Sequence, residues 1–164
     1  MASPSDTLTE TLYLSSSAPE VTQEIGKVLG RASQPGAIFL LTGELGAGKT
    51  CLTQGIAQGL EVPGYVRSPT FVMVTRSIGR LTLHHIDLYR VEDSFEALDL
   101  GLEELMYGDG VCVVEWAERA ADIFPESSVS ISIDYGASET ERSIALTAPA
   151  GAIADLRNAL KGYV

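Results

Sequence analysis

Residues 43–50 of the chain read Gly43-Glu44-Leu45-Gly46-Ala47-Gly48-Lys49-Thr50. The run matches the pattern G-x-x-x-x-G-K-[ST], in which glycines let successive backbone N–H groups curl around a phosphate. The apolar run Ile38-Phe39-Leu40-Leu41 precedes it, and a segment of helical character follows. A strand therefore delivers the loop, and the next helix directs the positive end of its dipole at the same anion. The sequence predicts a nucleoside triphosphate site, with Lys49 on the β- and γ-phosphates and the Thr50 hydroxyl on Mg²⁺.

The composition is that of a soluble globular protein. The 164 residues, 45% hydrophobic and 20% charged, predict one domain over residues 1–164, of which the first ten, rich in Ser and Thr, are expected to be loosely ordered. No apolar run reaches the roughly 18 residues of a membrane span, and the N-terminus lacks the basic and apolar regions of a signal peptide. These features predict a cytoplasmic protein. Cys51 and Cys112 fall in apolar elements, so both are predicted to be buried, reduced thiols.

The net charge argues against a direct nucleic-acid partner. The chain has 11 Lys and Arg against 22 Asp and Glu, for a formal charge of −11. A protein that binds the phosphate backbone of a nucleic acid tightly needs clustered basic residues to neutralise it. In this chain the arginines are scattered. Acidity of this size keeps a protein soluble and steers it toward a basic protein partner. Any role connected with nucleic acid is therefore predicted to be indirect.

Hydrophobic periodicity predicts a layered α/β fold. Helices are expected at residues 19–32, 49–60, 92–100, 102–107 and 150–160, and strands at residues 12–14, 37–42, 71–78, 81–88, 111–114, 129–135 and 142–147. The Gly79-Arg80 pair predicts a hairpin between two of these strands. Helices alternate with strands early in the chain, whereas hairpins appear later. The predicted fold is a P-loop NTPase-like domain, with a mixed sheet, mostly parallel at its centre, and helices on both sides.

Two acidic residues end predicted strands. Asp87 follows residues 83–86, and Glu115 follows the apolar run of residues 111–114. Both are expected at the carboxyl ends of their strands, where open α/β sheets bind ligands. Each is a candidate for holding Mg²⁺ or orienting an attacking group, and each is alternatively a helix cap or a solvated terminus.

Other residues have two interpretations that the sequence leaves open. The segment Ser68-Pro69-Thr70 is either a nucleotide-sensing loop, with the Thr70 hydroxyl on the metal or γ-phosphate, or a turn fixed by proline. His85 is either a catalytic base or a packed residue of an alternating strand. Trp116 either stacks on a base or a partner, or belongs to the core. Arg90 is a candidate arginine finger.

Four blocks of the sequence together resemble the TsaE family of bacterial ATPases. They are Gly43–Thr50, the segment Ser68-Pro69-Thr70-Phe71, the segment His85-Ile86-Asp87-Leu88-Tyr89-Arg90, and Val114-Glu115-Trp116, in this order and at similar spacing. The resemblance covers residues 8–148 and is much more specific than the phosphate-binding loop alone. TsaE proteins are needed to make threonylcarbamoyladenosine in tRNA, next to the anticodon.

The resemblance implies a partner, a cofactor and a set of site residues. It implies ATP with Mg²⁺, and a complex of TsaB and TsaD on which ATP is hydrolysed while another protein holds the tRNA. By the same resemblance Lys49, Asp87 and Glu115 are catalytic, and Thr50, Asp87 and Glu115 hold the metal. The nucleotide-binding residues are then Gly43, Glu44, Leu45, Gly46, Ala47, Gly48, Lys49, Thr50, Cys51 and Trp116.

Three other functional classes share parts of this pattern. A small-molecule or nucleotide kinase has the same loop but usually an Arg-rich lid, and no such segment is present. A regulatory GTPase would need a D-x-x-G switch and an N-K-x-D motif, whereas Asp87 is followed by Leu88-Tyr89-Arg90. A non-catalytic module would bind nucleotide only to keep its conformation. In that case Glu115→Ala would leave the output of the pathway unchanged.

Overall fold

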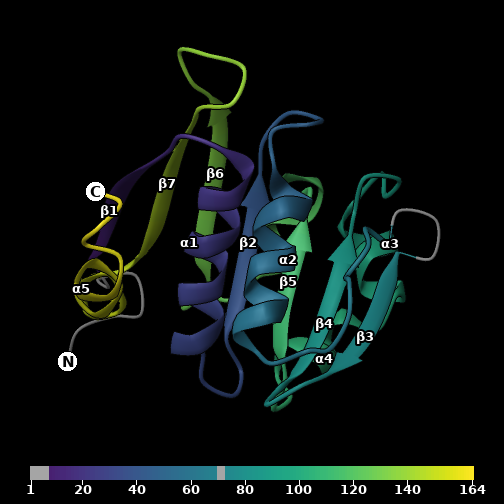
Figure 1. The fold of residues 1–164 in the computed structure, drawn as a ribbon. Coiled ribbons are helices and arrows are strands. Elements are labelled where there is room, and N and C mark those ends of the chain that lie inside the picture. Colours follow the sequence, from purple (N-terminus) through teal and green to yellow (C-terminus); the bar gives the residue numbers. More distant parts are fainter. Residues whose placement is uncertain (1–7, 70–72) are drawn as a thin grey trace.

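A single mixed β-sheet organises the molecule (Figure 1). The computed structural model describes residues 8–69 and 73–164. Within these residues the strand order is β1-β7-β6-β2-β5-β4-β3. The strands are β1 (Thr9–Ser16), β2 (Ile38–Thr42), β3 (Val74–Ile78), β4 (Thr82–Asp87), β5 (Val111–Glu115), β6 (Val129–Tyr135) and β7 (Arg142–Pro149). The central strands β6, β2, β5 and β4 are parallel, and β3, β7 and β1 add antiparallel pairs at the two sides. The predicted mixed sheet with a parallel centre is confirmed.

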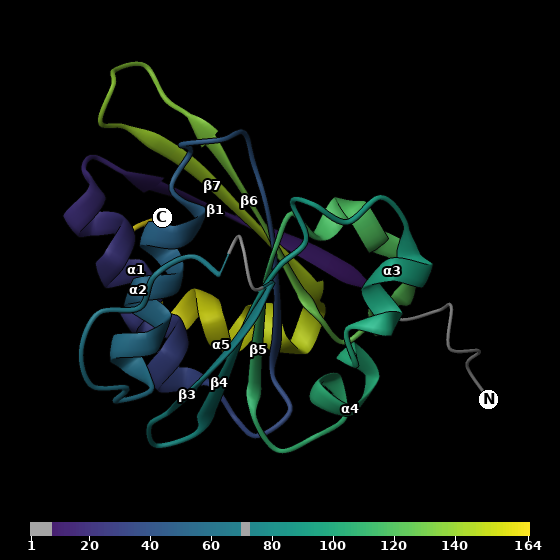
Figure 2. The same cartoon turned by 90° about the vertical axis from the view of Figure 1, so that its right-hand side faces the viewer.

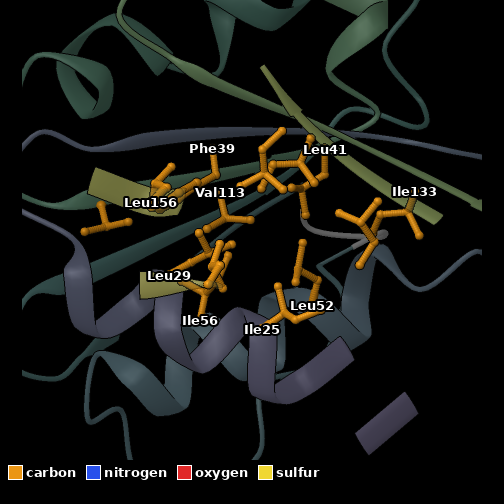
Figure 3. Close-up of a cluster of buried hydrophobic side chains, with 14 of the residues drawn as sticks. Ile25, Leu29, Phe39, Leu41, Leu52, Ile56, Val113, Ile133 and Leu156 are labelled. Carbon is orange, nitrogen blue, oxygen red and sulfur yellow. The ribbon is translucent and has the colours of Figure 1, made fainter. Parts of the chain in front are cut away.

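Helices cover both faces of the sheet (Figure 2). They are α1 (Pro19–Ala32), α2 (Lys49–Gly59), α3 (Ser94–Asp99), α4 (Leu102–Met106), the 3₁₀ segment η2 (Ala117–Ile123) and α5 (Ala150–Ala159). One hydrophobic cluster lies under α1, α2 and α5 (Figure 3), and a second lies under α3, α4 and η2. Burial on both faces explains why β2 and β5 are continuous apolar runs rather than alternating ones.

Pairing with neighbours extends or shifts several predicted elements. The strand expected at residues 12–14 runs over Thr9–Ser16, because every one of these residues pairs with β7. Thr9 and Glu10, expected to be loosely ordered, are therefore part of the sheet. The strand expected at residues 71–78 is seen as Val74–Ile78, and residues 71 and 72 lie outside the described part of the chain. No helix in that part is long and apolar enough to cross a membrane.

The two cysteines differ in environment. Cys112 is buried in β5, as predicted, and burial raises the pKa of its thiol to about 12. Cys51 is only half-buried, so the prediction of a buried side chain was wrong for it. It lies in the first turn of α2, beside the phosphate-binding loop, where its Sγ donates to the Pro19 carbonyl. Both thiols are free.

Helices α1 and α2 pack through glycines on both sides of the contact. Gly26 and Gly30 of α1 face Gly55 and Gly59 of α2, and each lies directly against backbone of the other helix. A Cβ added at Gly55 would lie 2.1 Å from the Gln23 carbonyl oxygen. Close approach of the two backbones therefore requires glycine at these positions. Since α2 begins at Lys49, this contact also fixes the helix that carries the phosphate-binding residues.

Replacing Gly55 with alanine should destabilise the protein by about 1–3 kcal/mol, the usual cost of overpacking a filled interior. The carbonyl that meets the new methyl group is backbone within α1 and cannot turn aside. Gly151→Ala in α5 is the matched control, because no atom lies within 4 Å of a Cβ built there. Urea denaturation of both variants measures the difference. Equal midpoints for Gly55→Ala and the wild type would contradict the packing argument.

Candidate functional site

The loop between β2 and α2 lies at the carboxyl end of the parallel strands, as the motif predicts (Figure 1). Gly46 and Gly48 have φ values of 82° and 117°, in the region that side chains rarely adopt. Gly48 is the residue that caps α2. These conformations open the backbone ahead of a helix N-terminus, which is the geometry that attracts anions. The predicted strand–loop–helix context is confirmed.

Lys49 reaches back over the loop that precedes it. Its Nζ donates hydrogen bonds to the carbonyls of Gly43 at 2.6 Å and Glu44 at 2.9 Å. The same ammonium lies 4.2 Å from the centroid of the Trp116 ring, a cation–π contact. Burial lowers the pKa of Lys49, and the carboxylate of Glu115 is the strongest of the charges that oppose the shift. The cation is thus enclosed by loop carbonyls and an aromatic face.

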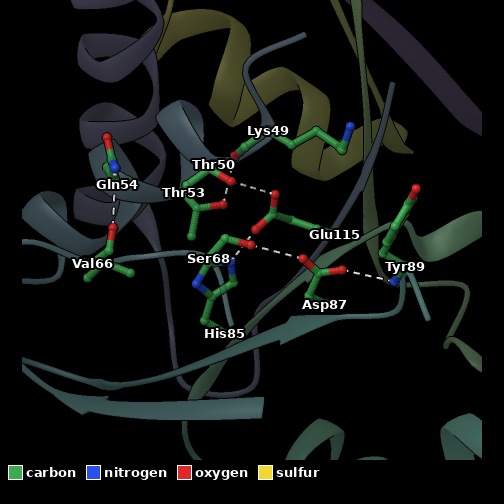
Figure 4. A network of polar contacts seen from close by, with 10 residues as sticks. All are labelled: Lys49, Thr50, Thr53, Gln54, Val66, Ser68, His85, Asp87, Tyr89 and Glu115. Atoms are coloured by element: carbon green, nitrogen blue, oxygen red, sulfur yellow. Dashed lines mark hydrogen bonds and ion pairs between the residues drawn. The ribbon is translucent and has the colours of Figure 1, made fainter. Parts of the chain in front are cut away.

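Glu115 connects the start of α2 to strand β4 (Figure 4). Its Oε1 accepts a hydrogen bond of 2.9 Å from Thr50 Oγ1, and its Oε2 lies against His85 Nε2. Parallel pairing of β2 with β5 sets Leu41 beside Glu115 and so brings the carboxylate under the phosphate-binding loop. His85 and Glu115 are both buried. His85 is therefore packed in the sheet and also in contact with the site.

Asp87 lies on the strand next to Glu115, and the two residues are register partners. Its Oδ2 accepts from Ser68 Oγ and its Oδ1 from the Tyr89 backbone N–H, both at 2.9 Å (Figure 4). Asp87 is buried, with 3% of its surface exposed. The structure thus places both predicted acids at the carboxyl ends of adjacent strands.

The converging side chains line a cavity of about 280 Å³. Its walls are Leu45, Gly46, Gly48, Lys49, Thr50, Cys51, Ser68, Asp87, Tyr89, Glu115 and Trp116. Most of the predicted site residues are in this set. Among the described residues that line the cavity, Lys49 is the one cation and Asp87 and Glu115 are the two carboxylates.

Some predicted residues lie beside the cavity rather than in its wall. Gly43 and Glu44 contribute carbonyls to Lys49, and Ala47 belongs to the same loop. Pro69 lies next to a separate depression near β3. Arg90 is exposed just after the cavity wall, and its role as an arginine finger stays a prediction. Thr70 lies outside the residues that the structure describes.

Tyr89 is a cavity residue that the sequence patterns did not single out. Its ring centroid lies 5.0 Å from that of Trp116, with the planes tilted by 52°. Trp116 has a left-handed backbone conformation, with φ of 60°, which turns the chain after β5. The position of Tyr89 could have indicated a role in the site. Tyr89 follows the strand-end acid Asp87 by two residues, at the carboxyl edge of the sheet where ligands bind.

The donor set fits Mg²⁺ that is bound together with phosphate. The described residues contain no group of three or more His, Cys, Asp or Glu that could hold a metal ion by itself. Mg²⁺ usually keeps several waters and takes only one or two carboxylates, with substrate phosphates completing its ligands. In the cavity wall, Asp87 and Glu115 supply two carboxylates and Thr50 supplies a hydroxyl oxygen.

Comparison with known proteins identifies relatives over most of the chain. Residues 16–144 match the family described as threonylcarbamoyl adenosine biosynthesis protein TsaE. A protein of Treponema pallidum with that function in its name, tRNA threonylcarbamoyladenosine biosynthesis protein TsaE, is 45% identical over 108 residues, 66% of this chain and 80% of the relative. The Bacillus subtilis protein of the same name is 44% identical over 131 residues, 79% and 81% of the two chains.

A solved structure has the same fold. The crystal structure of Bacillus subtilis YdiB superimposes with a TM-score of 0.80 and 34% sequence identity, over 94% of this chain and 96% of that one. The family match spans the phosphate-binding loop, Ser68, both strand-end acids and Trp116. Sequence and fold therefore point to the same set of relatives, and the matched segment contains the whole cavity wall.

Proposed function

Because this chain belongs to the TsaE family, we propose that it binds and hydrolyses ATP in the biosynthesis of threonylcarbamoyladenosine in tRNA. The observation that carries the proposal is the cavity in which Lys49, Thr50, Asp87 and Glu115 converge beneath a phosphate-binding loop. A lysine, a hydroxyl and two carboxylates around one cavity are groups that phosphoryl transfer to water uses.

Each residue has a distinct role in the proposal. The loop amides and Lys49 would bind the β- and γ-phosphates, and Thr50, Asp87 and Glu115 are the residues that would hold Mg²⁺. Bound Mg²⁺ supplies neutralisation of the phosphate charge. Glu115, fixed by Thr50 and His85, orients the attacking water and accepts its proton. Trp116 covers Lys49 and limits the access of bulk water, and the Tyr89 ring packs against Trp116.

The chain acts on a TsaB–TsaD complex in this proposal and has slow turnover by itself. Transition-state charge on a transferring phosphate is commonly stabilised by a second cationic side chain in addition to Mg²⁺, and the described cavity wall offers Lys49 as its one cationic side chain. A partner that adds a cation or positions the cavity loops would therefore accelerate hydrolysis. The net charge of −11 favours a protein partner over tRNA itself.

Replacing Asp87 with asparagine tests the metal role. The amide keeps an oxygen for the Tyr89 N–H but removes the negative charge, so we expect the Mg²⁺ concentration for half-maximal hydrolysis to rise about 10- to 100-fold. Nucleotide affinity without Mg²⁺ should change much less. Asp99→Asn, at an exposed position at the end of α3, is the control. Normal Mg²⁺ dependence of Asp87→Asn in the full complex would contradict the assignment.

ATP hydrolysis by the purified chain, alone and with TsaB and TsaD, tests the function. Phosphate release should be slow for the chain alone and should rise when the two proteins are added together, with TsaB–TsaD alone as the background. A filter-binding assay at physiological salt should show no tight tRNA binding by the isolated chain. Turnover that does not respond to TsaB–TsaD would remove the partner assignment, and a phosphorylated small-molecule product would replace the ATPase with a kinase.

A further inference from the structure

The hairpin of β6 and β7 lies beside the phosphate-binding loop (Figure 2), and two of its side chains donate hydrogen bonds to carbonyls of that loop. The Tyr135 hydroxyl, at the end of β6, donates a hydrogen bond of 2.9 Å to the Leu45 carbonyl. Arg142 Nε, at the start of β7, donates one of 2.9 Å to the Ala47 carbonyl. Tyr135 and Arg142 are register partners across the hairpin, so the two donors come from one rigid pair.

Arg142 is itself fixed in place. Its guanidinium donates to the carbonyls of Glu139 at 2.6 Å and Glu141 at 2.7 Å, and it lies 4.6 Å from the centroid of the Tyr135 ring. The planar guanidinium presents its donors in a rigid fork, so these contacts determine where the Nε–H points. The Arg142 side chain therefore connects the hairpin to the loop in a fixed orientation and is not a mobile surface cation.

Holding these two carbonyls determines where the neighbouring amides point. In a planar trans peptide the C=O and the following N–H are directed to opposite sides. With the Leu45 carbonyl turned to Tyr135, the Gly46 N–H faces away from the hairpin. With the Ala47 carbonyl turned to Arg142, the Gly48 N–H does the same. Gly46 and Gly48 lie between two hollows, the cavity, whose wall contains neither Tyr135 nor Arg142, and a separate depression that Arg142 lines. Away from Arg142 is therefore toward the cavity.

We propose that Tyr135 and Arg142 are positioning residues that set the Gly46 and Gly48 amides for phosphate binding. The proposal rests on the proposed function, since it needs a phosphate at the loop. A glycine-rich loop loses much conformational freedom when it closes on a ligand. Two side-chain donors on alternate carbonyls remove part of that freedom before the ligand arrives, which strengthens binding by preorganisation.

Two conservative variants test the proposal. Tyr135→Phe removes one hydroxyl and keeps the ring, and Arg142→Lys keeps the charge and removes the fork. Calorimetric titration with ADP and, separately, with inorganic tripolyphosphate should show affinity reduced about fivefold for Tyr135→Phe and by more for Arg142→Lys, with melting temperatures close to that of the wild type. Tyr13→Phe and Arg157→Lys, at exposed positions on β1 and α5, are matched controls and should bind both probes as the wild type does.

The two probes separate the possible results. Equal weakening of ADP and tripolyphosphate supports the proposal, because the amides contact phosphate only. Weakening of ADP alone would mean that the side chains contact the nucleoside, and it would overturn the proposal, as would unchanged binding of both probes. If Arg142→Lys unfolds, Tyr135→Phe decides by the same criteria. A wild-type chain that binds neither probe would instead overturn the proposed function, and this inference with it.

Discussion

Replacing Lys49 with alanine should reduce ATP affinity by about 100-fold or more and abolish measurable hydrolysis. Each charge-assisted hydrogen bond to a phosphate contributes about 1.5–3 kcal/mol, and Lys49 is expected to make more than one. The described cavity wall offers no second cation to take its place. Isothermal titration with ATP and a phosphate-release assay measure the two effects.

The Lys49→Ala variant should remain folded. The ammonium is buried, and burial lowers the pKa of Lys49, so its removal also removes the cost of enclosing a charge. Lys161→Ala is the control, because Lys161 is exposed beyond α5 and far along the chain from the loop. An affinity within threefold of the wild type, with Lys161→Ala equally unaffected, would show that the loop does not use this lysine.

Replacing Glu115 with glutamine should lower kcat by about 10²- to 10⁴-fold, the range for a lost general base. The loop amides and Lys49 remain, so ATP affinity should change far less than turnover. The amide oxygen can still accept from Thr50, which keeps that hydrogen bond. Single-turnover hydrolysis at saturating ATP, with TsaB and TsaD present, separates the chemical step from binding.

Glu118→Gln is the matched control for that experiment. Glu118 is exposed in η2, three residues after Glu115, and its carboxylate also acts on the charge of Lys49. Neutralising it changes the local charge by the same amount without touching Thr50 or His85. If both variants lost turnover equally, the effect of Glu115 would be electrostatic and general; normal turnover of Glu115→Gln would remove its catalytic role altogether.

The phosphate-binding side of the site could be predicted from sequence because its residues are consecutive. A strand, a glycine loop and a helix that starts at Lys49 follow one another along the chain, and local patterns specify each of them. Asp87 and Glu115 could also be placed at the ligand-binding edge, since both end predicted strands. Placing the two acids at this edge required only the direction of the strand that each one ends.

Contacts between distant strands could not be predicted in the same way. The hydrogen bond from Thr50 to Glu115 depends on the register of β2 against β5, and no pattern in either strand specifies it. The contact of His85 with Glu115 depends likewise on β4 lying beside β5. Alternation shows which face of a strand a residue occupies, but not which residue it meets.

The contacts between the β6–β7 hairpin and the phosphate-binding loop were even less predictable from the sequence. Arg142 and Ala47 are joined by a side-chain hydrogen bond across 95 positions of sequence. In the sequence, Arg142 is a charged residue at the start of an alternating strand and Tyr135 is the last residue of another. Neither position indicates a contact with the loop. Only the placement of β6 next to β2 in the sheet brings both residues to the loop.

The chain contains one tryptophan, and it lies in the cavity wall. All indole emission of the protein therefore originates from Trp116, whose ring contacts the Lys49 ammonium and the Tyr89 ring. Any ligand that draws Lys49 away from the Trp116 ring changes the electrostatic field at the fluorophore. The protein thus carries a built-in optical reporter of its own occupancy, and stopped-flow fluorescence can follow ligand arrival and release without a label.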